Sequence, residues 1–143
     1  MEKHAYMIIA HNDPYCFHKL IELLDDKRND FFVHIDKKSD ISLFNNVKTK
    51  YSNLYFTKRI DVRWGMYSQI EAELILLQSA RENGSYNRYH LLSGADLPIK
   101  SQNEIHAFFD ANKCKEFVGI APPQVMLRCK GEDGVYTRNA KMV

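Results

Sequence analysis

Four short polar segments carry most of the side chains in this sequence that could bind or transform a ligand. They are His11-Asn12-Asp13, His34-Ile35-Asp36-Lys37-Lys38, Arg59 to Gly65, and Ser93-Gly94-Ala95-Asp96. Each segment follows or ends a short apolar run that is typical of a buried β-strand. Histidine, carboxylate and lysine side chains at such positions can bind a base, sugar hydroxyls or a phosphate.

The first two segments offer histidines and a carboxylate. His11 precedes an expected helix whose N-terminal N–H groups favour anions, so it could stack on a base or bond a phosphate, or be a surface histidine beside a helix cap. His34 and Asp36 are two residues apart, so both side chains leave the strand on the same face. The carboxylate can accept from the N3–H of uracil or from ribose hydroxyls, while Lys37 and Lys38 could assist a diphosphate or be solvated.

The last two segments add an aromatic ring and a rigid turn. Trp64 offers a flat face for a sugar or base, or caps the core, and Gly65 permits close backbone approach. Ser68 could contact the ligand or cap the following helix. Gly94 and Asp96 belong to a Pro-containing turn that would hold one carboxylate beyond a strand. We expect Asp96, above all others, to contact the ligand.

Several common kinds of site are excluded by missing patterns. No glycine-rich dinucleotide fingerprint or P-loop follows the first strand, and no Gly-x-Ser-x-Gly elbow of an α/β hydrolase occurs. His34 and Asp36 could begin a metal site, but no third ligand is close in sequence, so we expect no metal.

Strands and helices alternate along the chain. Strands are expected at residues 4–10, 31–35, 54–57, 89–92 and 116–120, helices at 14–24, 67–82 and 101–109, and a short helix or turn at 41–47. The helix at 67–82 is expected to place Ile70, Leu74 and Leu77 on one apolar stripe. This order predicts an α/β fold with a mostly parallel sheet flanked by helices, and the four polar segments should meet at the carboxyl ends of its strands.

Composition limits the number of domains, the kinds of partner and the location that we expect for the protein. The chain has 143 residues, 45% of them apolar and 27% charged, and a formal net charge of +2, which favours a single globular domain and no nucleic-acid partner. No apolar run could cross a bilayer, so membrane contact would have to be peripheral or carried by residues outside this chain. Three widely spaced cysteines indicate reduced thiols and a cytoplasmic protein, with the inner face of the membrane as the other expected location.

A known enzyme family shares these segments in the same order. The core-2/I-branching β-1,6-N-acetylglucosaminyltransferase family, which includes the peptide O-xylosyltransferases, resembles this chain in KHAYMIIAHNDP, FFVHIDKKSD, RIDVRWGMYSQIEAELILL and YHLLSGADLPIKSQNEIHAFF. The resemblance runs from Lys3 to about Val118 and is most specific in the HID, WG-x-x-S and SGADLPIK blocks.

The resemblance implies a GT-A fold with a Rossmann-like nucleotide-binding half. It implies inverting transfer of GlcNAc or a related sugar from UDP-GlcNAc or UDP-xylose to a glycan acceptor hydroxyl. It also implies metal-independent catalysis without a cofactor, in which basic side chains replace a divalent ion at the diphosphate. Because animal members are Golgi membrane proteins and this chain shows no anchor, we expect a bacterial cytoplasmic enzyme.

The resemblance also selects donor-site residues. The loop at Ala10-His11, Asp36 and residues 63–68 would line the uridine side, and Asp96 the donor-sugar side. With the residues chosen above, the expected donor-binding set is Ala10, His11, His34, Asp36, Arg63, Trp64, Gly65, Ser68, Ser93, Gly94 and Asp96.

The end of the chain departs from the family pattern. In the family, the glutamate base and the basic residues at the diphosphate lie well beyond the SGADLP block, and APPQVMLRCKGEDGVYTRNAKMV does not match it. We expect residues 1–120 to form the nucleotide-sugar-binding domain and 121–143 an irregular tail or the start of an acceptor half. The base is unassigned, and the chain is either a fragment of a longer enzyme or diverged at its end. The alternative function is a non-catalytic nucleotide-sugar-binding or interaction module.

Overall fold

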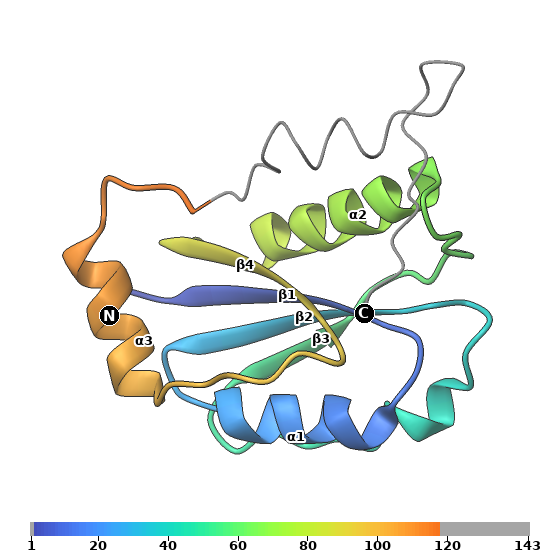
Figure 1. The fold of residues 1–143 in the computed structure, drawn as a ribbon, viewed down its shortest axis with the longest axis horizontal. Coiled ribbons are helices and arrows are strands. Elements are labelled where there is room, and N and C mark those ends of the chain that lie inside the picture. Colours follow the sequence, from blue (N-terminus) through green and yellow to red (C-terminus); the bar gives the residue numbers. More distant parts are fainter. Residues whose placement is uncertain (1, 118–143) are drawn as a thin grey trace, which may run out of the picture. The chain divides into compact units, whose positions relative to one another are not determined.

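A computed structural model describes residues 2–117 of the chain (Figure 1). Strands and helices alternate in the order β1 (His4–Ala10), α1 (Pro14–Leu24), β2 (Asn29–Ile35), a 3-10 turn η1 (Ile41–Leu43), β3 (Asn53–Phe56), α2 (Tyr67–Asn83), β4 (Arg88–Ser93) and α3 (Gln102–Ala111). The predicted elements up to residue 111 are therefore present, with ends that shift by up to two residues. The strand expected at 116–120 falls mostly outside the described residues, and 116–117 are not in a strand.

The four strands form one sheet in the order β3-β2-β1-β4, and every pairing in it is parallel. The central strand β1 runs in unbroken register with both neighbours, from His4 opposite Asn29 to Ala10 opposite Ile35. Because the strands are parallel, the loops that leave β1, β2, β3 and β4 emerge at the same edge of the sheet. The predicted α/β class is confirmed, with an architecture consistent with a GT-A-like, Rossmann-like half.

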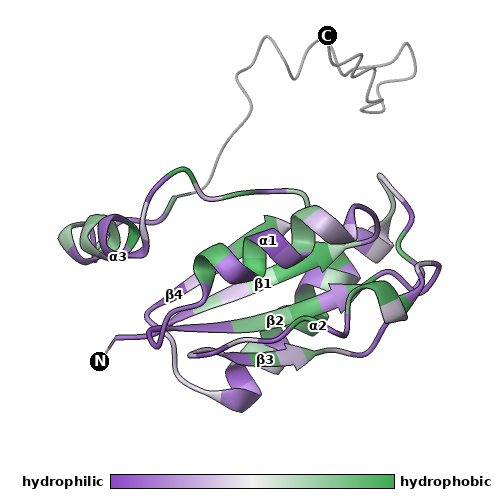
Figure 2. Cartoon of the chain, turned by 90° about the horizontal axis from the view of Figure 1, so that it is seen from below, coloured by the Kyte–Doolittle hydropathy of each residue, from purple (hydrophilic) through white to green (hydrophobic). Residues whose placement is uncertain are grey.

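Helices cover both faces of this sheet, α1 below and α2 above in Figure 1. Side chains of α1 pack with the Tyr6, Ile8, Phe31 and Val33 face, whereas Leu76 and Ala80 of α2 pack with the opposite face. The strands alternate between these two apolar layers, and Figure 2 shows the apolar colouring concentrated in the sheet and in the helix faces next to it.

Local sequence explains the start of α1. The Asp13 carboxylate accepts from the Cys16 N–H at 3.0 Å, and Pro14 occupies the first turn, where its missing N–H is harmless. Asp13 itself is left-handed, with φ 51°, a conformation that Asp tolerates better than most residues. Asp13 is therefore the N-cap of α1.

The predicted buried stripe of α2 is wrong. Ile70 and Leu74 are 52% and 51% exposed, and the buried residues are Ala72, Leu76 and Ala80, although Leu77 is partly buried against the core. The buried positions are four apart along the helix, and their small alanine side chains permit close approach of α2 to β1 and β2. The stripe of Ile70, Leu74 and Leu77 is therefore not the face that packs on the sheet.

Three histidines cluster at the amino-terminal edge of the sheet, where α3 packs. His90 Nε2 lies 3.1 Å from His4 Nδ1, and the His106 ring of α3 stacks on His4 with centroids 4.0 Å apart. His106 Nε2 also lies 2.9 Å from Asn29 Oδ1, and Phe109 packs edge-on to His90. We call His4, His90 and His106 the histidine cluster. It couples α3 to strands β1, β2 and β4.

The chain divides into two compact units, residues 1–111 and 112–143. Of the second, residues 112–117 are described, including a turn in which Lys115 N–H donates to Asn112 O at 3.0 Å. The predicted domain boundary at 120 lies outside the described residues. Within residues 2–117, none of the helices has the length and apolar character needed to span a bilayer.

Candidate functional site

A pocket of about 420 Å³ opens at the carboxyl edge of the sheet. All four polar loops contribute to it, as the parallel sheet predicts. Its walls also include the strand residues Ile9, Leu91 and Leu92 and two side chains from α2. The lining residues are Ile9, His11, Asp36, Lys38, Val62, Trp64, Gln69, Glu73, Leu91, Leu92 and Ser93.

Hydrogen bonds hold the loops after β2 and β4 against β1 and the loop that follows it. The Asp36 N–H donates to Ala10 O at 2.9 Å, and the Gly94 N–H donates to Ile9 O at 2.8 Å. Ser39 Oγ donates to His11 O at 2.7 Å. A Cβ on Gly94 would lie 2.5 Å from the Ala10 Cβ, so this approach requires glycine. Ala10 and Gly94, both predicted donor-site residues, therefore shape the pocket wall by close packing, and neither lines the pocket.

Arg59 fastens the loop after β3 to the loop after β2. Its guanidinium donates to four carbonyl oxygens, those of Ile35 at 3.1 Å, Asp36 at 2.8 Å, Lys37 at 3.3 Å and Ser39 at 2.5 Å. The Lys37 N–H donates in return to Ile60 O at 3.0 Å. Carbonyls at the end of a strand lack ladder partners, and one arginine satisfies several of them here. Sequence reasoning did not select Arg59, because an arginine in a polar loop has no distinguishing local pattern.

Asp36 and Lys38 form an ion pair inside the pocket wall. The Asp36 side chain is 7% exposed, and it accepts from the Lys38 N–H at 2.9 Å and from Lys38 Nζ at 3.0 Å. The same ammonium donates to Asp61 and, at 2.7 Å, to Val62 O. The hydrogen bond that Lys38 donates to Asp61, and then the one that it donates to Asp36, raises the pKa of Lys38 above its ordinary value. All three ammonium protons thus have partners within the protein, and a phosphate would have to displace one of them.

His34 is a buried residue that bonds the loop after β3. It is fully buried, and its Nε2 accepts from the Ile60 N–H at 3.1 Å, so the ring is neutral with its proton on Nδ1. Burial lowers the pKa of His34, and the nearby Asp36 charge opposes that shift. His34 does not line the pocket. Its observed contact is with the loop after β3.

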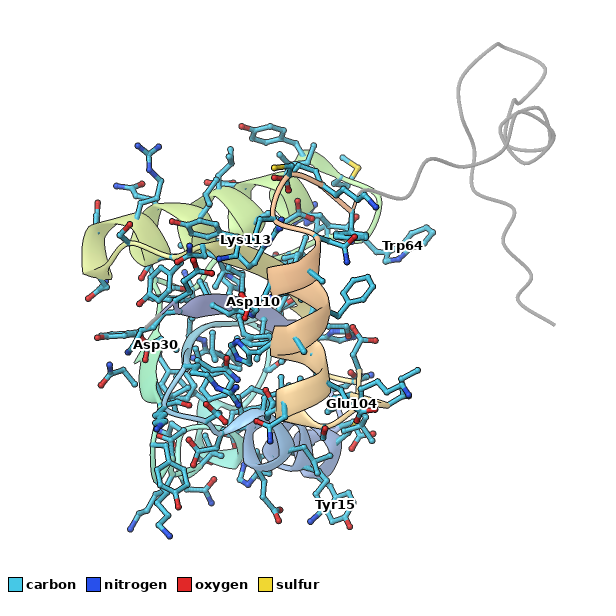
Figure 3. The ribbon with its side chains drawn as sticks, turned by 90° about the vertical axis from the view of Figure 1, so that its left-hand side faces the viewer. Tyr15, Asp30, Trp64, Glu104, Asp110 and Lys113 are labelled. Atoms are coloured by element: carbon cyan, nitrogen blue, oxygen red, sulfur yellow. The ribbon has the colours of Figure 1, made fainter. Side chains whose placement is uncertain are left out.

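The segment before α2 places Trp64 at the pocket edge (Figure 3). Gly65 is left-handed, with φ 73°, and its N–H donates to Gln69 Oε1 at 2.7 Å. Ser68 Oγ accepts from the Arg63 N–H at 2.8 Å. Of the four residues predicted in this segment, Trp64 lines the pocket, whereas Arg63, Gly65 and Ser68 build the turn that carries it.

Asp96 closes the turn after β4. Its Oδ2 accepts from the Ser93 N–H at 2.8 Å, while Ser93 Oγ accepts from the Ala95 N–H at 3.2 Å. Ser93 lines the pocket and Asp96 does not. The observed role of Asp96 is that of a turn-forming acid, and its expected contact with a ligand stays a prediction.

Two α2 side chains in the pocket were missed from the sequence. Gln69 and Glu73 lie four residues apart, so they share one face of the helix. The Glu73 carboxylate is half-buried and makes no hydrogen bond within residues 2–117, which leaves it able to accept from a ligand. Their spacing was visible in the sequence, but the direction of that face depends on how α2 packs on the sheet.

The charges in the pocket do not form a metal centre in the described part of the chain. No group of three or more His, Cys, Asp or Glu side chains in residues 2–117 is arranged to hold a metal ion. The pocket instead combines apolar walls with an aromatic ring, a saturated ion pair, one unpaired carboxylate and the exposed His11. This combination suits a ligand with a flat ring and several hydroxyl or N–H donors.

Comparisons with known proteins agree on one family. A family model described as Core-2/I-Branching enzyme matches residues 4–127. A Mus musculus beta-1,3-galactosyl-O-glycosyl-glycoprotein beta-1,6-N-acetylglucosaminyltransferase 4 is 24% identical over 106 residues, 71% of this chain and 23% of its own length. A Homo sapiens beta-1,3-galactosyl-O-glycosyl-glycoprotein beta-1,6-N-acetylglucosaminyltransferase is also 24% identical over 106 residues, 71% of this chain and 25% of its own length. The chain therefore spans about a quarter of the length of these curated relatives.

Proposed function

Because this chain belongs to the core-2/I-branching enzyme family, we propose that its pocket binds a nucleotide-sugar donor and that the chain is the donor-binding part of a glycosyltransferase. The observation that carries the proposal is the meeting of all four polar loops around one pocket at the carboxyl edge of a parallel sheet. Open α/β sheets bind their ligands at this edge. The names of the two relatives favour N-acetylglucosamine as the transferred sugar.

The pocket chemistry favours the nucleoside and sugar over the diphosphate. Trp64 presents an aromatic face, and Glu73 can accept from hydroxyl or N–H groups. Lys38 is held by Asp36 and Asp61, so it is poorly placed to neutralise phosphates. We propose that UDP-GlcNAc or UDP-xylose is the donor and that no divalent ion is needed.

The proposed reaction is a single displacement. The acceptor hydroxyl oxygen forms a bond to C1 of the sugar while the bond from C1 to the diphosphate oxygen breaks, and the configuration at C1 inverts. The hydroxyl proton passes to a carboxylate base, and the bonding electrons leave with UDP. Asp36 is unsuited to be that base, because both of its oxygens already accept from Lys38.

Calorimetry tests donor binding directly. UDP, UDP-GlcNAc and UDP-xylose should each bind saturably with EDTA present, and ADP should bind more weakly. A folded sample that binds none of the three uridine nucleotides contradicts the donor-site proposal. Binding that requires Mg²⁺ or Mn²⁺ contradicts metal independence alone.

One substitution separates the two roles of Asp96. Asp96→Asn keeps an oxygen that can accept from the Ser93 N–H, so the turn should persist while the charge is lost. If Asp96 contacts the donor, UDP-GlcNAc should bind at least several-fold more weakly to this variant. Unchanged affinity would remove Asp96 from the donor site.

A non-catalytic nucleotide-sugar-binding module is the second candidate. The ion pair of Asp36 with Lys38 favours it for this chain, because that pair leaves Glu73 as the only unpaired carboxylate that lines the pocket in residues 2–117. A transfer assay with a radiolabelled UDP-sugar and glycan acceptors distinguishes the two candidates. Donor binding without transfer supports the module.

A further inference from the structure

Trp64 is held at the pocket by a turn that depends on the first residues of α2. The turn is closed by the Met66 N–H, which donates to Arg63 O at 3.1 Å. Gly65, between Trp64 and Met66, adopts φ 73°, where a side chain would strain the backbone. Trp64 is 63% exposed.

Gln69 supplies the contact that joins this turn to the pocket wall. Its Oε1 accepts from the Gly65 N–H at 2.7 Å, a short and well-formed hydrogen bond. Gln69 also lines the pocket beside Trp64. The donor in this contact is a backbone N–H, so the amide oxygen of Gln69 must face Gly65, which fixes the amide orientation. Its amino group is then the end that remains for a ligand.

We propose that Gln69 is a positioning residue that sets the orientation of Trp64 at the pocket edge. It acts through the hydrogen bond to Gly65, the residue next to Trp64. Ser68 fixes the start of the same turn through the Arg63 N–H, whereas Gln69 fixes its centre. The value of this orientation for binding rests on the proposed function, in which the Trp64 ring packs on the uracil or the sugar of the donor.

The sole tryptophan of the chain makes the proposal measurable without a ligand. Gln69→Leu removes the acceptor at similar volume, and Gln69→Glu keeps an oxygen that accepts from the Gly65 N–H. Gln78→Leu is the matched control, because Gln78 lies on the same helix, is exposed and bonds Glu82 instead. Fluorescence anisotropy and acrylamide quenching then report the mobility and exposure of Trp64 in each variant.

We expect Gln69→Leu to lower the anisotropy of Trp64 and to speed its quenching, while Gln69→Glu and Gln78→Leu match the wild type. UDP binding to Gln69→Leu should weaken roughly tenfold, which corresponds to about 1.4 kcal/mol. Circular dichroism and thermal unfolding should show that each variant is folded.

Two results overturn the proposal. One is a folded Gln69→Leu variant whose Trp64 anisotropy and quenching equal those of the wild type. The other is a Gln69→Glu variant with a mobile Trp64, which remains informative even if Gln69→Leu does not fold. If wild-type protein binds no UDP but the anisotropy changes as expected, the donor-site proposal fails and the role of Gln69 stands.

Discussion

Acid should destabilise this fold through the histidine cluster. Burial, followed by the charges of His106 and His90, lowers the pKa of His4 to about 3, and burial, followed by the charge of His106, lowers that of His90 to about 4. Burial also lowers the pKa of His106. Arg88 and Arg28 add to these shifts, because their positive charges disfavour a protonated imidazole nearby. The cluster is therefore neutral in the folded protein at neutral pH.

The direction and size of the effect follow from proton linkage. A histidine whose pKa is lower in the folded than in the unfolded chain binds a proton more readily when unfolded, so stability is full above pH 6.5 and falls as pH drops toward the folded pKa. For each histidine that stays neutral in the folded protein, the loss between pH 6.5 and pH 5 is about 2 kcal/mol. A cluster with three such groups should lose at least this amount.

Urea denaturation at pH 7, 6 and 5 measures this loss as a falling free energy of unfolding. His90→Gln keeps a polar side chain but removes one titrating group, so its stability should depend less steeply on pH, even if it is lower at pH 7 because the ring contacts are lost. His18→Gln is the control, because His18 bonds Leu43 O on the surface, away from the cluster. A wild-type stability that is flat from pH 7 to 5, or an equal slope in His90→Gln, would refute the reasoning.

Three further predictions concern the carboxyl edge of the sheet. Glu73→Gln should improve binding of UDP-glucuronate relative to UDP-GlcNAc by several-fold in competition titrations, because it removes an unpaired carboxylate from the pocket, whereas Glu71→Gln, outside the pocket, should leave the ratio unchanged. Arg59→Met should lower the free energy of unfolding in urea by about 2–4 kcal/mol, because it leaves carbonyls at the end of β2 without a donor. Equal stability of the variant and the wild type would show that Arg59 does not stabilise these loops. Gly94→Ala should lower the thermal midpoint at a cost of about 1–3 kcal/mol, because the new methyl meets the Ala10 Cβ, and adding Ala10→Gly should recover part of it. No recovery in the double variant would show that the loss arises elsewhere.

Elements with strong local signals were predictable from the sequence. The apolar run at residues 4–10 and the helix expected at 14–24 have the predicted bounds, and Ser101 with Glu104 forms a capping box ahead of α3. The start of β2 was missed, because Asn29 and Asp30 are typical of a loop. Both are buried with distant partners that no local pattern reveals: Asn29 donates to Leu24 O and Gln102, and Asp30 accepts from Lys3 and Tyr86.

The location of the candidate site could be predicted from the sequence, but only some of the residues that line it could. Parallel-sheet topology brings the four loops together, and His11, Asp36, Trp64 and Ser93 of the expected donor-binding set line the pocket, while their contact with a donor stays a prediction. Contacts that depend on packing were not predictable. The face of α2 that lines the pocket is determined by which residues of the helix are buried on the sheet. The hydrogen bond from Lys38 to Asp61 depends on how the loops after β2 and β3 pack together.

The Arg59 side chain has a consequence for the kinetics of ligand binding. It joins the loops after β2 and β3 through side chain to backbone contacts that need no ligand, so the conformational entropy of ordering them is lost during folding rather than at binding. A pocket that is already in its binding geometry should associate with different donors at similar rates. Differences in affinity among those donors would then arise mainly from how slowly each one leaves.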